Sequence, residues 1–166
     1  MNRRNNRNRP FNYTSLLQQR PQAWAMVQGS RDYPGIQGNV RFYQTPRGVL
    51  VSAEFVGLPN PSEICRSPVF GFHIHEGDSC TGTREDPFAD VRMHYNPYNC
   101  PHPYHVGDLP PLFGVNGYAF SVFLTNRFTV REIVGKTVIV HGSPDDFTTQ
   151  PSGNAGTKMA CGQIRG

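Results

Sequence analysis

Residues 36–57 read IQGNVRFYQTPRGVLVSAEFVG, two runs of alternating apolar and polar residues separated by the turn-forming TPRG. In the first run the alternate apolar positions are Val40 and Phe42. In the second run the alternation falls on Val49, Val51, Ala53 and Phe55. A period of two is what a strand with one buried face shows. This stretch therefore predicts two strands joined by a short turn.

Similar short runs recur along the rest of the chain. Five further strand-like runs are AWAMVQG (23–29), VFGFHIHEG (69–77), YAFSVFLT (118–125), TVIVHG (137–142) and KMACGQI (158–164). Turn-forming PG, LPNP and VNG lie between runs. No helix of ordinary length is predicted, and residues 127–135 are interpreted as a loop with one turn. The pattern predicts an all-β fold, an antiparallel Greek-key β-sandwich or flattened barrel of seven or eight strands.

Two long segments without strand patterning, residues 80–112 and 142–158, interrupt this regularity. Connections of this length are uncommon in compact domains and are usually functional. We therefore expect the site to be built from these two loops.

The length of 166 residues and the charge distribution indicate one domain with a tail. Residues 1–20 hold five arginines and no acid, whereas the rest of the chain has eleven basic and twelve acidic residues. The net charge of +4 therefore belongs to the tail. We predict a mobile basic Arg/Asn-rich tail over residues 1–21 and a domain over residues 22–166.

Two interpretations of the tail remain open: a solvated extension, or a segment that contacts an anionic surface such as nucleic acid, a cell wall or a spore coat. No specific nucleic-acid site is predicted. The N-terminal residues contain no apolar segment of the kind that a secretory signal needs. No stretch is long and apolar enough for a transmembrane helix. Location stays open between the cytoplasm and a surface or spore association reached by a non-classical route.

The six histidines carry the strongest chemical signal. His73 and His75 alternate in a strand, so their imidazoles share a face; the alternative is a pair of surface histidines. His141 ends the apolar run TVIV, and alone it would be interpreted as structural. Neither feature decides a function by itself.

The loop that starts at His94 adds three more candidate ligands. His102, His105 and Asp108 follow one another at intervals of three, close enough to gather one ion. Imidazole and carboxylate ligands suit zinc, and the alternative is a solvated polar loop. Together the order HxH, His, HxxHxxD and His leaves no histidine over, which favours a metal site.

Five segments resemble the signature motifs of copper/zinc superoxide dismutases in the family's order: GFHIHEGDSC, HYNPYNCPH, HVGDLP, VIVHGSPDD and GNAGTKMACGQI. The resemblance covers residues 23–164 and is nearest to the bacterial branch. It implies the two-metal disproportionation of superoxide to oxygen and hydrogen peroxide. The implied copper ligands are His73, His75, His94 and His141. The implied zinc ligands are His94, His102, His105 and Asp108.

The resemblance also assigns further roles. His94 would bridge the two metals, leaving copper and taking a proton when copper is reduced. Asp145 would link a copper ligand to a zinc ligand, and Lys158 would stand at the copper site where the family normally has arginine. A lysine offers a point charge where arginine offers a rigid fork, so attraction of the anion is expected to survive.

The family's intrasubunit disulfide implies a Cys80–Cys161 bond. Cys65 and Cys100 are extra, and a disulfide between them and two free thiols are equally compatible with the sequence. The short spacing from His102 to His105 and the compact second loop, which lacks a basic residue before Lys158, predict a slower catalyst. A non-catalytic copper/zinc-binding relative, serving metal sequestration or a structural coat, is the alternative function. Oligomeric state is open between monomer and homodimer.

Overall fold

The alternation predicted for residues 36–57 is present in the computed structural model as an antiparallel pair, β2 (Gln37–Thr45) and β3 (Gly48–Val56). The apolar residues of the alternation are 0% exposed: Val40, Phe42, Val49, Val51, Ala53 and Phe55. Burial of this face against the opposite strands supplies the core, since removing apolar surface from water is the main stabilising term.

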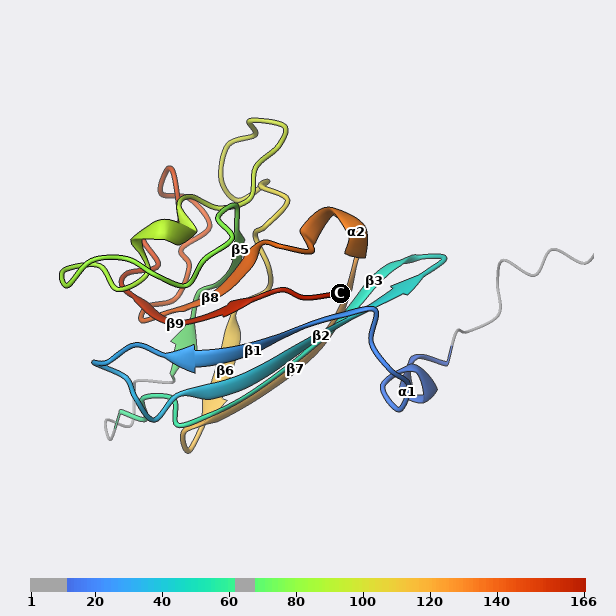
Figure 1. The fold of residues 1–166 in the computed structure, drawn as a ribbon, viewed down its shortest axis with the longest axis horizontal. Helices are drawn as coiled ribbons and strands as arrows, with labels where there is room; N and C mark the ends of the chain where they lie inside the picture. The colour runs from blue at the N-terminus through green and yellow to red at the C-terminus, as the bar shows by residue number, and fades with distance from the viewer. Residues whose placement is uncertain (1–11, 62–67) are drawn as a thin grey trace, which may run out of the picture.

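The structure describes residues 12–61 and 68–166, and within them nine strands form one antiparallel sheet (Figure 1). Their order is β4-β6-β7-β3-β2-β1-β9-β8-β5. The remaining strands are β1 (Ala23–Gly29), β4 (Val69–Phe70), β5 (Phe72–His75), β6 (Leu112–Val115), β7 (Tyr118–Thr125), β8 (Thr137–His141) and β9 (Lys158–Gln163). The predicted all-β antiparallel class is confirmed.

Gly71 explains why the sheet curls into a nearly closed barrel. The two ends of the sheet are β4 and β5, and only Gly71 separates them in the chain. The two edge strands of the sheet therefore follow each other end to end in the chain, which brings the two edges of the sheet together. A Cβ on Gly71 would lie 2.8 Å from the Cβ of Ala155 and 3.3 Å from that of His141, so glycine is what this close approach tolerates.

Three details differ from or refine the sequence prediction. The predicted strand over 69–77 is divided at Gly71, and β6 was missed because its four residues lie between Pro111 and a turn. The turn expected within 127–135 is the one-turn helix α2 (Val130–Ile133). The first long loop contains the short 3-10 helix η2 (Ala89–Val91).

Part of the predicted tail lies outside the described residues, namely residues 1–11 with four of the arginines. The described part contains one helical turn, α1 (Tyr13–Leu16), and Tyr43 donates a hydrogen bond to the carbonyl of Leu17 at 3.4 Å. None of the helices in the described ranges is long and apolar enough to cross a membrane.

Candidate metal centre

Strand β5 places His73 and His75 on one face. All four residues of the strand are buried, with Phe72 and Ile74 in the hydrophobic core and the two histidines on the other side. The histidines are 0% and 3% exposed, so they are not surface histidines. Because β5 is hydrogen-bonded to β8, the backbone that carries both imidazoles is held in place by the sheet.

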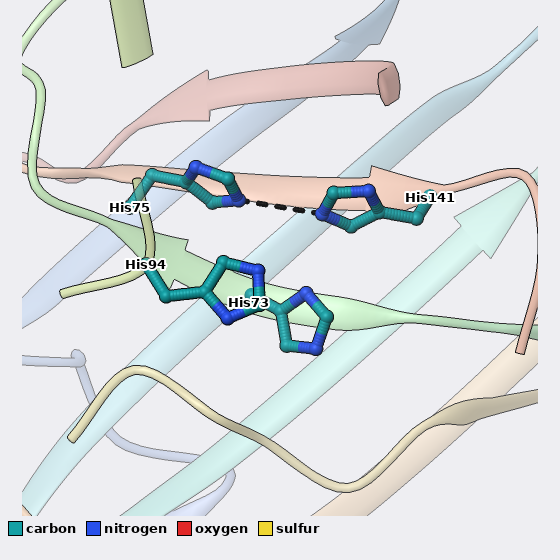
Figure 2. Close-up of side chains that lie close together, drawn as sticks. All are labelled: His73, His75, His94 and His141. Atoms are coloured by element: carbon teal, nitrogen blue, oxygen red, sulfur yellow. Dashed lines mark hydrogen bonds between the residues drawn. The ribbon is translucent and has the colours of Figure 1, made fainter. Parts of the chain in front are cut away.

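Two further histidines complete a buried group that we call the four-histidine cluster. Its ligand atoms all lie within 4.8 Å of one another, and its members are His73, His75, His94 and His141 (Figure 2). His94 forms an isolated bridge to His75, and His141 follows a register shift at the end of β8. Segments far apart in the sequence thus converge on one point.

The outer nitrogens of two cluster rings are bound to backbone carbonyls. His75 Nδ1 lies 2.8 Å from the carbonyl oxygen of Arg92, and His141 Nδ1 lies 3.3 Å from that of Gly156. A carbonyl accepts only, so each Nδ1 carries the proton and each Nε2 is left as a lone pair. These two Nε2 atoms lie 3.3 Å apart and face each other, an arrangement that suits a cation between ligands.

The other two rings each turn an unpartnered nitrogen inward. His73 Nδ1 and His94 Nε2 are buried and make no hydrogen bond. A buried polar atom without a partner is costly, so these atoms are consistent with binding of an ion. Four imidazole nitrogens are a donor set that suits copper.

His94 also belongs to a second group, the His–Asp cluster, with His102, His105 and Asp108. His94 Nδ1 donates to Asp108 Oδ1 at 2.8 Å. The Nδ1 atoms of His102 and His105 lie 3.1 and 3.4 Å from the same carboxylate but form no hydrogen bond. Three imidazoles and one carboxylate at one point match the preferences of zinc.

Asp145 connects the two clusters. Its carboxylate accepts hydrogen bonds from His73 Nε2 at 2.8 Å, His102 Nε2 at 2.9 Å and the backbone N–H of Phe147 at 2.7 Å. The residue is 5% exposed. Gly153 makes room for it, since a Cβ there would lie 2.1 Å from Asp145 Oδ1. Outer hydrogen bonds of this kind fix the tautomer and orientation of ligand histidines.

Burial lowers the pKa of four of the histidines and so keeps these four neutral. Desolvation is the main cause, and it lowers the pKa of His73 to about 4 and that of His141 to about 3. The same cause lowers the pKa of His75 and of His105. Neutral imidazole is the form that binds metal, so the rings are ready to ligate at neutral pH.

The two carboxylates of the centre are held ionised. Burial alone would raise their pKa values, but hydrogen bonds and nearby imidazoles outweigh it. The bond from His94 lowers the pKa of Asp108, and the bonds from His73, Phe147 and His102 lower that of Asp145. The centre therefore combines neutral rings with anionic oxygens.

Comparison with known proteins agrees with this geometry. Residues 36–164 match the family described as copper/zinc superoxide dismutase (SODC). The chain belongs to this family. It is 30% identical over 143 residues to superoxide dismutase [Cu-Zn] 2 of Aquifex aeolicus, covering 77% of this chain and 78% of the relative. It is 32% identical over 136 residues to the Legionella pneumophila superoxide dismutase [Cu-Zn], covering 77% of each.

One solved structure has a similar fold. It is a double mutant of a SOD-like protein from Bacillus subtilis, with a TM-score of 0.68 and 26% identity. The match covers 86% of this chain and 97% of the other. The proteins that resemble this chain thus include one that is described only as SOD-like.

Lys158 lies beside the four-histidine cluster but is already paired. It is opposite His141 in the β8–β9 ladder, so the two side chains share a face. Its Nζ donates to Asp86 Oδ2 at 2.6 Å and to the carbonyl of Phe88 at 3.1 Å. No sequence pattern indicates Asp86, because 72 residues separate it from Lys158.

The Cys80–Cys161 disulfide implied by the family resemblance is present. It joins the first long loop to β9 and packs with a small apolar cluster of Phe88, Val91 and Ile139. Cys65 lies outside the described residues, so the choice between a Cys65–Cys100 disulfide and two free thiols stays open.

Arg127 is a further residue that the sequence analysis missed. Its Nη1 donates to the carbonyl oxygens of Pro103, His105 and Asp108, each at 3.1 Å. The short HxxHxxD loop is therefore clamped from the end of β7. An arginine in RFTV has no motif that indicates this role, since its partners are carbonyls of another loop.

Proposed function

We propose that the protein is a superoxide dismutase, which converts two superoxide anions and two protons into oxygen and hydrogen peroxide. The observation that carries the proposal is the convergence of buried ring nitrogens in the four-histidine cluster. Copper would be held there by His73, His75, His94 and His141. Zinc would be held in the His–Asp cluster by His94, His102, His105 and Asp108.

Copper bound in the four-histidine cluster would supply one-electron exchange, taking an electron from one superoxide and returning it to the next. The chain's own residues hold the rings and handle the proton. His94 Nε2 is buried and unpartnered, so it can carry a proton for the peroxide product. Asp145 keeps the rings of His73 and His102 in one orientation. Lys158 adds a positive charge beside His141 for the anionic substrate.

The test is superoxide consumption by the protein loaded with copper and zinc, measured by stopped-flow spectroscopy. We expect consumption well above that of the same concentration of free copper. Consumption equal to that of free copper would contradict the proposal. Metal content of the same samples shows whether both clusters are filled.

The second candidate is a non-catalytic copper/zinc-binding protein for metal sequestration or a coat. Two observations favour this second candidate: the similar structure is described only as SOD-like, and Lys158 is paired with Asp86. It shares the metal sites with the first candidate, so spectra would be alike. Tight copper binding without turnover would select it.

Assembly and surface binding are finer proposals about the same protein. A homodimer would give twice the monomer mass by light scattering. Contact of the basic tail with an anionic surface would be lost when residues 1–20 are deleted. Equal retention of both forms on an anionic matrix would rule out the surface contact.

A further inference from the structure

Lys158 lies in an open pocket of about 570 Å³ beside the four-histidine cluster. Gly156 also lines this pocket, and its carbonyl accepts the hydrogen bond from His141 Nδ1. One layer of residues therefore separates the pocket from the cluster. His141 is 5% exposed, the largest exposed fraction of the four residues, and its Nδ1 is bound to the carbonyl of the pocket-lining Gly156.

Acids outnumber bases in the lining of this pocket, and one of the acids, Asp32, is paired with Arg31 outside the lining at 3.8 Å. Its charged lining residues are three acids and one base: Asp32, Glu85, Asp86 and Lys158. Lys158 is thus the sole cation among the lining residues, and its charge is taken up by Asp86 at 2.6 Å. A like-charged surface slows the approach of a substrate anion, whereas a cation accelerates it.

Asp86 is held in place for this contact. Its Oδ1 accepts the backbone N–H of Phe88 at 3.2 Å, and its Oδ2 accepts from Lys158. The loop that carries Asp86 is tied to the strand of Lys158 by the Cys80–Cys161 disulfide. The acid therefore stays near the ammonium rather than sampling solvent freely.

We propose that Asp86 is a positioning residue that competes with the substrate anion for Lys158. Its carboxylate takes the hydrogen bond and the charge that superoxide would use, so capture of the anion requires release of Lys158 from Asp86. The Asp86 carboxylate is 44% exposed and the Lys158 side chain is 19% exposed, so the pair is open to solvent on the carboxylate side, and there an anion can compete for the ammonium. This inference rests on the proposed function and gives a physical reason for the slower catalysis that the sequence predicts.

The decisive variant is Asp86→Asn. The amide oxygen can still accept the N–H of Phe88, so the turn is kept while the negative charge is removed. Glu85→Gln is the matched control, because Glu85 lines the same pocket and its carboxylate makes no ion pair within residues 12–61 and 68–166. Both variants remove one charge from one pocket, and only one of them frees Lys158.

Three measurements test the proposal. The first is the rate of acylation of Lys158 by an amine-reactive ester, followed by mass spectrometry. The second is the concentration of inorganic phosphate that protects Lys158 from the ester. The third is superoxide consumption by the metal-loaded protein over a range of ionic strength.

For Asp86→Asn we expect faster acylation, protection at lower phosphate and faster superoxide consumption, each by roughly two- to fivefold, the factor carried by an exposed ion pair. The consumption rate should also fall more steeply with added salt, because an unpaired cation attracts anions at longer range. Glu85→Gln should change each quantity by less than half as much.

Equal behaviour of the two variants would overturn the proposal, since it would show a general effect of pocket charge. Slower consumption in Asp86→Asn would also overturn it, because Asp86 would then orient Lys158 for capture. If the wild-type protein consumes no superoxide while acylation and phosphate protection respond as expected, the dismutase proposal fails and the competition for Lys158 stands.

Discussion

At the residue scale, the two nitrogens of each ring have separate tasks. The outer nitrogens of His73, His75 and His141 are bound to Asp145 or to backbone carbonyls. The inner nitrogens are thereby fixed as lone pairs directed at one point. A histidine elsewhere on the same strands would lack these outer hydrogen bonds, so its two nitrogens would not be assigned separate tasks.

Replacement of His141 tests the division of ligands between the clusters. His141→Ala should lower superoxide consumption by at least about 100-fold, because removing a ligand costs at least as much as removing its supporting group. Zinc content should stay unchanged, since His141 is not part of the His–Asp cluster. His105→Ala is the opposite control, expected to lose zinc first. Zinc loss in His141→Ala would contradict the division, and elemental analysis measures it.

Replacement of Arg127 tests whether its hydrogen bonds support the HxxHxxD loop. Arg127→Ala removes the donor to three carbonyls and should weaken zinc binding by about 10- to 100-fold, the range for supporting groups of metal ligands. Competition with a chromogenic chelator measures the affinity. Arg131→Ala, at an exposed position on α2, is the control. Equal zinc affinity in both variants would show that the loop needs no clamp.

At the element scale, the barrel strands and the two long loops divide the work. Strands β5 and β8 contribute His73, His75 and His141, and the loops contribute the other ligands. The strands were predictable, because period-two burial is a local property. The loop conformations were not, because contacts such as His102 with Asp145 join residues 43 positions apart.

The Cys80–Cys161 bond is the covalent link between loop and strand. It closes a loop across a sequence separation of 81 residues, so its removal should cost about 2–5 kcal/mol of unfolding free energy. Cys80→Ser with Cys161→Ser should show this loss in urea unfolding of the metal-free protein. Cys100→Ser is the control, since Cys100 forms no disulfide within residues 12–61 and 68–166. Equal stability of the double variant and the wild type would contradict the prediction.

At the scale of the whole molecule, the long loops shield the candidate metal centre from water. The two edge strands of the sheet meet in the chain at Gly71. The long loops lie beside β5 and β8, outside the barrel (Figure 1). All seven candidate ligands are buried as a result. This burial lowers the stability of the metal-free protein by an amount that depends on pH.

The metal-free protein should lose stability as the pH falls from about 6.5 to 4. Unfolded histidines titrate near 6.5, whereas the folded pKa values of His73 and His141 are about 4 and 3. In this window the unfolded chain binds more protons, so unfolding becomes more favourable, by about 3 kcal/mol at pH 4 from His73 alone. Urea unfolding at several pH values measures the loss.

Bound metal provides the control for this prediction. A metal ion ligated by the rings competes with protons, so the loaded protein should resist acid over the same range. Stability of the metal-free form that stays constant from pH 7 to 4 would show that the rings are not held neutral.

The strand pattern, the family resemblance and the set of seven candidate ligands could be predicted from the sequence, because each depends on residue type and spacing along the chain. The grouping of these candidates into two buried clusters that share His94, and the ring nitrogen that each turns inward, depend on the folded structure. The same is true of the contacts of Asp86 with Lys158 and of Arg127 with the loop that carries His102, His105 and Asp108. These contacts join segments that are far apart in the sequence and are brought together only by the tertiary fold. A pattern of neighbouring residues therefore cannot predict them.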